Sequence, residues 1–185
     1  MQKLHFMSVR QLHDKTFESF ISPTEIQDKI AAVAERLNID YEGKSPLLVI
    51  VLNGAFMFAA DLIKHCSFDL KTAFIRVSSY KGTSSTGDLK EVLGLDDEIV
   101  KNEDVIIVED IVDTGLTIEY LHEYIKTLNP KSLKVASLLF KPDAYDKETN
   151  IDYIALSIPN KFVVGYGLDY NELGRNLPGI YVLKE

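Results

Sequence analysis

The sequence predicts an α/β protein with an open, mostly parallel, twisted sheet flanked by helices. Short apolar runs alternate along the chain with segments of helical periodicity, which is typical of successive strand–helix–strand units. Two of the runs, Leu47–Leu52 and Val105–Val108, are apolar throughout, as strands buried on both faces of a parallel sheet are. The chain has 185 residues, of which 46% are hydrophobic and 26% charged, so it can bury a substantial core.

The elements of the first half follow from caps and periodicity. A helix begins at the capping box Ser22–Glu25, and its apolar residues recur at helical spacing as far as Leu37. The strand Leu47–Leu52 comes next, then a helix over Ala55–Lys64 and a strand over Phe68–Ser79.

The second half begins with the polar, glycine-bounded segment 81–88, which predicts an exposed loop long enough to suggest function. The elements expected after it are the strand Val92–Leu95, the strand Asp104–Val108, the helix Leu116–Leu128, and the strands Lys134–Phe140 and Ile151–Leu156. Beyond Pro159 the chain is rich in Gly, Tyr and Asn and shows no clear helix. We therefore expect a single domain, 1–185, with a core of about 22–158 and a small subdomain built mainly from 159–185 with the N-terminal segment.

The charge balance and the single cysteine exclude several classes of protein. The 28 acidic and 20 basic residues give a net charge of -8, which disfavours general attraction to nucleic acid or an anionic membrane. With Cys66 as the one cysteine, neither an intrachain disulfide nor a thiolate metal cluster is possible. No apolar run approaches the roughly 20 residues of a membrane span, and no signal peptide is visible. We expect a cytoplasmic protein.

The most informative stretch is 105–117. An apolar strand leads into two adjacent carboxylates, Glu109 and Asp110, and a short Asp-Thr-Gly-x-Thr turn then opens a helix. Ligands of open α/β sheets lie at the carboxyl ends of strands, and the free N–H groups of a helix N-terminus bind anions there. Gly115 lets the backbone approach such an anion closely. Because no lysine follows this glycine, the P-loop of a kinase is excluded.

A phosphate would be repelled by Glu109 and Asp110, so these carboxylates need another partner. They are acceptors, suited to a sugar diol or to a hard cation. Thr114 and Thr117 add hydroxyl donors for the phosphate. Phosphate donors and diol acceptors one turn apart indicate a ribose 5-phosphate. In the simpler alternative, Asp113 only caps the helix and the acidic pair is solvated, but the full pattern favours the ligand site.

This stretch resembles the phosphoribosyl-pyrophosphate signature of the type I phosphoribosyltransferases. Other segments are similar to the hypoxanthine-guanine branch of that family: Leu52-Asn53-Gly54 to its pyrophosphate loop, Ser79-Tyr80 to its mobile lid, and 161–172 to its purine-binding hood. The match runs in chain order from about Ile26 to Leu183. The resemblance implies the type I phosphoribosyltransferase fold, in which the small subdomain is the hood.

The implied reaction displaces pyrophosphate from C1 of phosphoribosyl pyrophosphate (PRPP) by N9 of hypoxanthine or guanine, giving IMP or GMP through an oxocarbenium-like transition state. The resemblance assigns the ribose hydroxyls and one Mg²⁺ to Glu109 and Asp110, and the acid/base role at purine N7 to Asp113. It assigns the 5-phosphate to the segment made of Asp113, Thr114, Gly115, Leu116 and Thr117.

Pyrophosphate and the second metal ion fall to two other segments in the same resemblance. Leu52, Asn53 and Gly54 bind pyrophosphate, in the family through a non-proline cis peptide, although many relatives have lysine where this chain has Asn53. Arg175 contacts pyrophosphate as a forked donor, and Asp169 binds a second Mg²⁺. Taken alone, Asn53-Gly54 is a plain turn and Asp169 a loop carboxylate.

The purine needs a stacking face and edge contacts. By resemblance, Phe162 supplies the face, Lys141 donates to the purine O6, and the backbone carbonyl of Val163 accepts from the 2-amino group of guanine. Adenine is disfavoured because its 6-amino group would meet a cation. Taken alone, Phe162 is a core residue and Lys141 a surface lysine. Ser79 and Tyr80 begin the lid, which would exclude water and which we expect to be poorly ordered without ligand.

Two other functions compete with this hypothesis. One is an enzyme of the same branch that prefers xanthine; the other is a nucleotide-sensing, RNA-binding regulatory module of the same superfamily, which needs a basic face that the net charge opposes. We expect small-molecule substrates, neither nucleic acid nor membrane as partner, and, from the resemblance, a homodimer or homotetramer.

Overall fold

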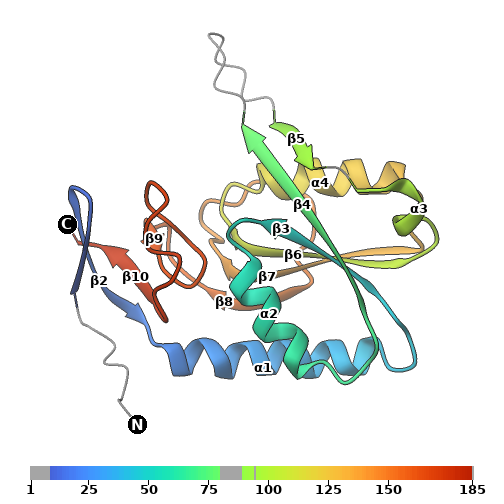
Figure 1. Cartoon of the computed structure of the whole chain (residues 1–185), viewed down its shortest axis with the longest axis horizontal. Helices are drawn as coiled ribbons and strands as arrows, with labels where there is room; N and C mark the ends of the chain where they lie inside the picture. Colours follow the sequence, from blue (N-terminus) through green and yellow to red (C-terminus); the bar gives the residue numbers. More distant parts are fainter. Residues whose placement is uncertain (1–8, 80–88, 94, 185) are drawn as a thin grey trace.

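The larger sheet of the computed structural model has the predicted open, mostly parallel arrangement. The structure describes residues 9–79, 89–93 and 95–184. Within this part of the chain, six strands pair in the order β5-β4-β3-β6-β7-β8 (Figure 1). Neighbours from β4 to β8 are parallel, and β5 is antiparallel at one edge. The bounds are Leu47–Leu52 (β3), Lys71–Ser79 (β4), Leu89–Leu93 (β5), Asp104–Val112 (β6), Ser132–Phe140 (β7) and Tyr153–Ser157 (β8).

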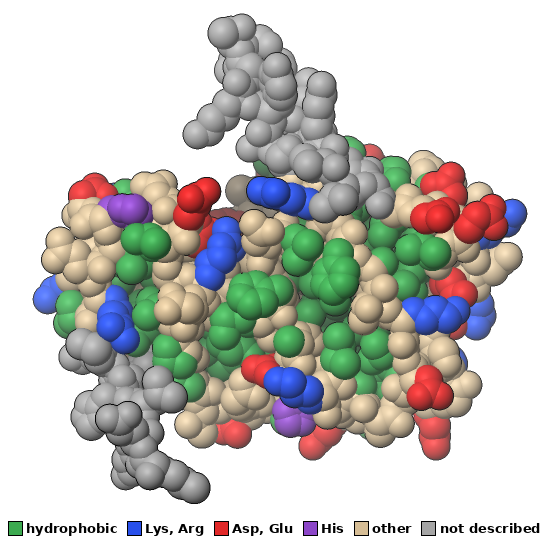
Figure 2. All heavy atoms as spheres, viewed as in Figure 1, with side chains coloured by type: hydrophobic (Ala, Val, Ile, Leu, Met, Phe, Trp, Pro, Cys, Tyr) green, Lys and Arg blue, Asp and Glu red, His purple; other side chains and the backbone are tan. Residues whose placement is uncertain are grey.

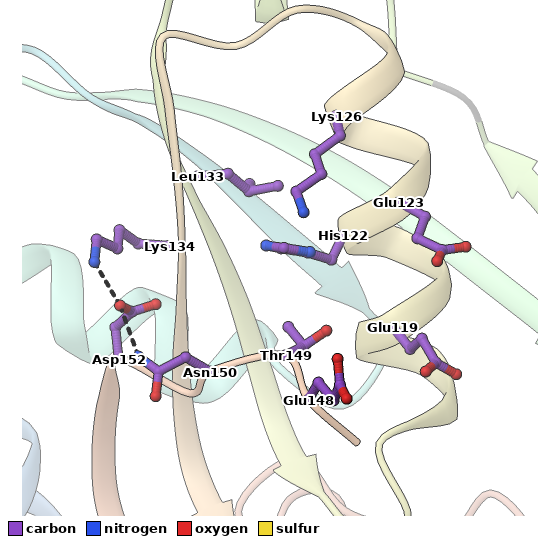
Figure 3. A pocket seen from close by; sticks show the side chains of 10 residues that line it. All are labelled: Glu119, His122, Glu123, Lys126, Leu133, Lys134, Glu148, Thr149, Asn150 and Asp152. Atoms are coloured by element: carbon purple, nitrogen blue, oxygen red, sulfur yellow. Dashed lines mark hydrogen bonds and ion pairs between the residues drawn. The ribbon is translucent and has the colours of Figure 1, made fainter.

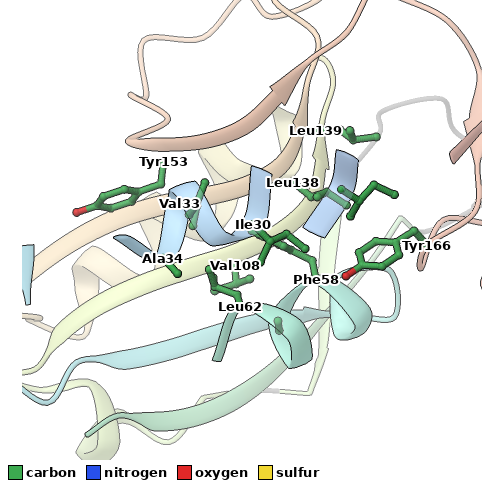
Figure 4. Close-up of a cluster of buried hydrophobic side chains, with 14 of the residues drawn as sticks. Ile30, Val33, Ala34, Phe58, Leu62, Val108, Leu138, Leu139, Tyr153 and Tyr166 are labelled. Atoms are coloured by element: carbon green, nitrogen blue, oxygen red, sulfur yellow. The ribbon is translucent and has the colours of Figure 1, made fainter. Parts of the chain in front are cut away.

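Helices cover both faces of this sheet. On one face, α1 (Pro23–Asp40) and α2 (Phe56–His65) pack their apolar side chains against those of β3, β6 and β7 (Figure 4). On the other face lie α4 (Leu116–Thr127) and the short α3 (Asp97–Val100). Successive residues of β3 enter opposite clusters, which explains why this strand is apolar at every position.

Ser22 fixes the start of α1, as the sequence predicts. Its Oγ accepts a hydrogen bond from the backbone N–H of Glu25 at 3.2 Å, and Pro23 occupies the first turn. The buried residues of the helix are the predicted ones: Ile26, Ile30, Val33, Ala34 and Leu37. The helix continues beyond Asn38, to Asp40.

The small sheet combines the two ends of the chain. β1 (Val9–Leu12), β2 (Lys15–Ile21), β10 (Ile180–Leu183) and β9 (Val163–Val164) pair antiparallel in that order, at the left of Figure 1. It has a core of its own, formed by Phe17, Val164, Leu177 and Tyr181. The expected hood beside a parallel core is confirmed. None of the helices in the described ranges is long and apolar enough to cross a membrane.

Several predicted boundaries are wrong. β4 begins at Lys71 rather than Phe68, and the return strand β5 is Leu89–Leu93 rather than Val92–Leu95. The predicted strand Asp104–Val108 is too short, since pairing with β7 extends β6 to Val112. The acidic pair therefore lies inside a strand rather than after it, where the packed sheet shields it from water.

Candidate active site

The predicted phosphate and pyrophosphate segments and the purine residue Lys141 lie at the carboxyl ends of the parallel strands, which are called the sheet edge below. β3, β6 and β7 are parallel neighbours, so their carboxyl ends lie side by side. Leu52-Asn53-Gly54 ends β3, Asp113–Thr117 follows β6, and Lys141 follows β7. The backbone N–H of Lys141 donates to the carbonyl oxygen of Val112 at 3.0 Å, which ties the second and third segments together.

The acidic pair is buried at this edge. Glu109 is 6% and Asp110 9% exposed. Asp110 accepts a hydrogen bond from the backbone N–H of Ile111 at 2.8 Å, and Oε1 of Glu109 accepts from that of Asp110 at 3.2 Å. The other oxygen of Glu109, Oε2, is buried and has no hydrogen-bond partner among the described residues. A buried, unpartnered carboxylate oxygen is expensive, so this atom suits a cation or a hydroxyl donor.

Both carboxyl groups of the pair have raised pKa values. Burial is the main cause for each, because it penalises the charged form, and the charge of Asp110 further raises the pKa of Glu109. Hydrogen bonds and the positive charge of Arg175 act in the opposite direction on Asp110, but burial outweighs them. A positive charge bound beside these two buried carboxylates would therefore stabilise their ionised forms.

Gly54 is needed because Asp110 occupies the space of a side chain. A Cβ at Gly54 would lie 1.4 Å from Oδ2 of Asp110, so only glycine fits there. The preceding Leu52–Asn53 peptide bond is cis, as the family resemblance implies, and Asn53 is exposed. The pyrophosphate segment and the acidic pair are therefore in direct contact.

Asp113 pairs with Lys141 instead of capping α4. Oδ2 of Asp113 lies 2.6 Å from Nζ of Lys141; the side chain of Lys141 is 7% exposed and that of Asp113 is 44% exposed. The N-cap of α4 is Gly115, which has no side-chain capping hydrogen bond, so the alternative in which Asp113 caps the helix is wrong. The predicted surface position of an isolated lysine is also wrong for Lys141, which is buried.

Gly115 is required for a reason that the sequence does not reveal. Its φ is 84°, and a Cβ there would lie 2.4 Å from Cε2 of Tyr145 and 2.8 Å from Cγ of Lys147. Tyr145 therefore packs on the backbone of the phosphate segment. Leu116 is 54% exposed, and Thr114 is exposed. A small cavity of about 90 Å³ lies along this segment, lined by Ile111–Ile118.

Arg175 and Asp169 form an ion pair beside this edge. Nη2 of Arg175 lies 2.5 Å from Oδ1 of Asp169, and its Nη1 donates to the carbonyl oxygen of Gly167 at 2.7 Å. Oδ2 of Asp169 accepts from the backbone N–H of Glu172 at 2.7 Å. Among the described residues no group of three or more His, Cys, Asp or Glu side chains is arranged to hold a metal ion, so Asp169 does not join the acidic pair in one cluster.

The other predicted purine residues, Phe162 and Val163, belong to the hood, and the predicted lid begins at the end of β4. Phe162 is 46% exposed, with its ring 6.1 Å from that of Phe17, while Val163 is buried in β9. The expected core position of an isolated phenylalanine is wrong here, and an aromatic face is left available. Ser79 is the last residue of β4. Tyr80 and the segment 81–88, including its expected disorder, lie outside the described residues.

A larger cavity lies away from the predicted residues. It measures about 540 Å³ and opens between α4, β7 and the segment Glu148–Asp152 (Figure 3). His122 and Lys126 line it from α4, and Lys134 forms an ion pair with Asp152 at 2.6 Å on its opposite side. None of the predicted site residues lines it.

Comparison with known proteins identifies the family. Residues 22–171 match the phosphoribosyl transferase domain. The hypoxanthine-guanine phosphoribosyltransferase of Lactococcus lactis is 46% identical over 173 residues, covering 92% of this chain and 93% of that protein. A solved hypoxanthine phosphoribosyltransferase from Staphylococcus aureus is 36% identical with a TM-score of 0.84, covering 100% of this chain and 96% of that one.

Another relative is much longer than this chain. The bifunctional protein TilS/HprT of Listeria monocytogenes is 44% identical over 174 residues, which cover 94% of this chain but 27% of that protein. The residues that match the family, 22–171, include the three segments that end β3, follow β6 and follow β7. The chain belongs to the phosphoribosyltransferase family and is similar to its hypoxanthine-guanine members.

Proposed function

We propose that this protein transfers the phosphoribosyl group from PRPP to N9 of hypoxanthine or guanine, forming IMP or GMP and pyrophosphate. The observation that carries the proposal is the meeting of three chemically distinct segments at one sheet edge: the phosphate segment after β6, the buried acidic pair, and the Lys141–Asp113 pair. These two substrates need hydrogen-bond donors for their phosphate groups, acceptors for the ribose diol and a donor for the purine edge.

The 5-phosphate binds at the N-terminus of α4 in this proposal. Free backbone N–H groups of residues 113–117 and the hydroxyl groups of Thr114 and Thr117 donate to it. Glu109 and Asp110 accept from the ribose hydroxyls, which gives the unpartnered Oε2 of Glu109 a donor. Asp113 then acts at N7 of the purine, holding or taking a proton as N9 forms the bond to C1.

The acidic pair also fits Mg²⁺. Its pKa values are raised by burial, one of its oxygens has no partner among the described residues, and carboxylate oxygens are ligands that Mg²⁺ prefers. Bound Mg²⁺ supplies positive charge that stabilises the pyrophosphate leaving group. Asp169 is the proposed ligand of a second Mg²⁺, and Arg175, which now pairs with it, would then donate to pyrophosphate.

Binding of the purine gives Lys141 a second partner. Its ammonium has three N–H donors, so it can donate to O6 of the base as well as to Asp113, and this competition weakens the hold on the half-exposed carboxylate that faces N7. Phe162 stacks on the base, and the carbonyl of Val163 accepts from the 2-amino group of guanine. Ser79 and Tyr80 begin a lid that excludes water from the oxocarbenium-like centre.

We further propose a cytoplasmic homodimer or homotetramer with small-molecule substrates. Figure 2 supports a contact between copies: hydrophobic side chains gather in the middle of the face viewed there, where Figure 1 has α2 and β4. Phe56 on α2 is 43% exposed and Phe74 on β4 is 51% exposed. Such large exposed aromatic side chains are common at interfaces.

Steady-state assays with hypoxanthine, guanine, xanthine and adenine, each with and without Mg²⁺, test the proposed function. We expect Mg²⁺-dependent turnover with the first two bases and little with adenine. A preference for xanthine would revise the substrate. RNA binding that weakens with salt, together with no turnover of any base, would replace the enzyme by a regulatory module.

A further inference from the structure

Tyr166 connects the hood to both helices on one face of the sheet. It lies just after β9 and is 3% exposed. Its hydroxyl group donates to Oδ2 of Asp61, on α2, at 2.5 Å. Nε2 of Gln27, on α1, donates to the same carboxylate oxygen at 2.7 Å and to the hydroxyl oxygen of Tyr166 at 3.2 Å. Three elements thus meet in one closed hydrogen-bond network, and Lys64 neutralises the other oxygen of Asp61 at 2.8 Å.

The segment that begins at Tyr166 carries the charged pair of the proposed pyrophosphate site. The backbone N–H of Gly167 donates to the carbonyl oxygen of Arg175 at 2.9 Å, and Arg175 returns a side-chain hydrogen bond to the carbonyl oxygen of Gly167. Arg175 also holds Asp169. These bonds close the segment 166–175 on itself. Tyr166 anchors it twice, through its hydroxyl group and through its backbone N–H, which donates to the carbonyl oxygen of Leu177 at 2.9 Å.

This segment approaches the pyrophosphate loop backbone to backbone at Gly167. Gly167 has a φ of 100°, and a Cβ there would lie 2.1 Å from the carbonyl oxygen of Gly54. Gly54 leads directly into α2, the helix that carries Asp61. The Tyr166–Asp61 hydrogen bond therefore joins the segment 166–175 to α2, and α2 directly follows the Leu52-Asn53-Gly54 loop that this segment contacts.

We propose that Tyr166 and Asp61 are positioning residues that hold the segment 166–175 against Leu52-Asn53-Gly54 and so set the geometry of the pyrophosphate end of the site. The inference rests on the proposed function, since it concerns binding of the diphosphate of PRPP. Tyr166 itself touches no proposed reacting group; it acts through Gly167 and Arg175. The purine end has other anchors: Lys141 follows β7, and β10 holds Phe162 and Val163 through the small sheet.

The chain offers a matched control in Tyr153. This side chain is also 3% exposed, and its hydroxyl group donates to Oδ2 of Asp40 at 2.6 Å, so it too joins a buried tyrosine to a carboxylate. It lies at the start of β8, paired with Ala136 and away from the carboxyl ends of the strands. Figure 4 shows Tyr153 and Tyr166 at opposite ends of the same hydrophobic cluster.

The test compares Tyr166→Phe with Tyr153→Phe in the full chain, measuring thermal midpoint, kcat and both KM values. The free energy of one lost hydrogen bond corresponds to about a fivefold change in a dissociation constant. We therefore expect Y166F to raise the KM for PRPP and the inhibition constant of pyrophosphate by about that factor. We expect its kcat to change less than about twofold and its KM for hypoxanthine to stay constant. Y153F should lower the thermal midpoint by a similar amount and leave every kinetic constant unchanged.

Asp61 gives a second route to the same link should Y166F not fold. Asp61→Ala removes the acceptor and should reproduce the rise in KM for PRPP, whereas Asp61→Asn keeps a carbonyl oxygen for Tyr166 and should restore most of the wild-type value. An active Y166F or D61A with an unchanged KM for PRPP would overturn this inference alone, as would equal changes in Y153F. A wild-type protein without turnover would overturn the proposed function and this inference with it.

Discussion

The ammonium group of Lys141 lies 2.6 Å from a carboxylate oxygen of Asp113, so the proposed purine-edge donor and the proposed acid/base group neutralise each other. The lysine is the buried partner and the aspartate the half-exposed one. In the proposed function, a purine O6 that accepts from Lys141 takes another of the three N–H donors of its ammonium and competes with Asp113, whose carboxylate then serves N7. The proposed function thus couples recognition of the base at Lys141 to the carboxylate of Asp113 through this ion pair.

The first prediction concerns Asp113→Asn. We expect turnover to fall by about a hundredfold or more, because general acid–base groups contribute factors of that size, while affinity for PRPP changes little. Single-turnover kinetics and PRPP titration separate the two quantities. A variant that keeps its turnover but loses affinity would remove the acid/base role and leave Asp113 as a phosphate-segment residue.

The same variant should also be less stable. Asparagine leaves the ammonium of Lys141 buried without a counter-charge, which should lower the free energy of unfolding by about 1–2 kcal/mol. Lys141→Met serves as the comparison: it removes the buried charge, and the half-exposed Asp113 can be hydrated, so its stability should match or exceed that of the wild type. Urea unfolding of both variants measures this difference. Equal losses of unfolding free energy in the two variants would contradict the assignment of Lys141 as the buried partner and Asp113 as the hydrated one.

Glu109→Gln should stabilise the protein when neither PRPP nor Mg²⁺ is present. Burial raises the pKa of Glu109, so between its ordinary pKa of about 4.3 and the raised value the folded state binds more protons than the unfolded state. The wild-type free energy of unfolding therefore falls as pH rises through this window. The variant should gain about 1–2 kcal/mol near neutral pH and nothing near pH ~4.

Glu123→Gln is the control for this prediction, since it makes the same charge change at an exposed position of α4. Its stability should stay within about 0.5 kcal/mol of the wild type at both pH values. The gain of Glu109→Gln should come with weaker PRPP binding, as expected where a site keeps a destabilising group for function. A pH-independent effect of Glu109→Gln would show that burial of its charge is not the cause.

Gly115→Ala should be strongly destabilising for two separable reasons. Its φ of 84° is unfavourable for alanine, and the added Cβ would meet the ring of Tyr145 at 2.4 Å. We expect a loss of about 2–4 kcal/mol. Gly43→Ala isolates the first reason, because Gly43 has a φ of 71° with no atom within 4 Å of the added Cβ; its loss should be about 1–2 kcal/mol. Adding Tyr145→Ala to Gly115→Ala should recover part of the difference, since Cγ of Lys147 still lies 2.8 Å from the added Cβ; full additivity in that double-mutant cycle would refute the contact with Tyr145.

Cys66 should react slowly with thiol reagents. Burial raises the pKa of its thiol to about 11, and the thiol donates to the carbonyl oxygen of Leu62. The reactive thiolate is then about one part in a thousand at pH ~8. Labelling with a chromogenic disulfide reagent should be far slower than for a free cysteine and accelerate on unfolding in urea. Rapid labelling of the folded protein would contradict the burial.

The predictable part of the fold is the part that local pattern determines. The cap at Ser22 and the apolar run Leu47–Leu52 lead to α1 and β3 because a capping hydrogen bond and two-sided burial need only neighbouring residues and a generic sheet. β1 and β2 were not predicted as strands, because they pair with each other and with β10, which is distant in sequence. The predicted end of β6 at Val108 is wrong because charged residues rarely continue a buried strand. Pairing with β7 shows that Glu109 and Asp110 nevertheless belong to β6.

The same division applies to the site. The sequence predicts site residues in the segments 105–117 and 161–172, because the chemistry and the resemblance there involve consecutive residues. Consecutive residues do not reveal the contacts of Tyr145 and Tyr166, since each is made with a residue far along the chain, Gly115 in one case and Asp61 in the other. Gly165 and Gly167, on either side of Tyr166, are the sequence signal that this backbone packs closely against other segments. A Cβ at either position would lie 2.1 Å from a backbone carbonyl oxygen.

Simultaneous measurement of IMP and pyrophosphate, formed from hypoxanthine and PRPP by the purified protein with Mg²⁺, tests the proposed transferase activity most directly. We predict equal amounts of both products throughout the time course, and strongly reduced formation of both by Asp113→Asn. Pyrophosphate release without IMP, or neither product with any of the four bases, would contradict it.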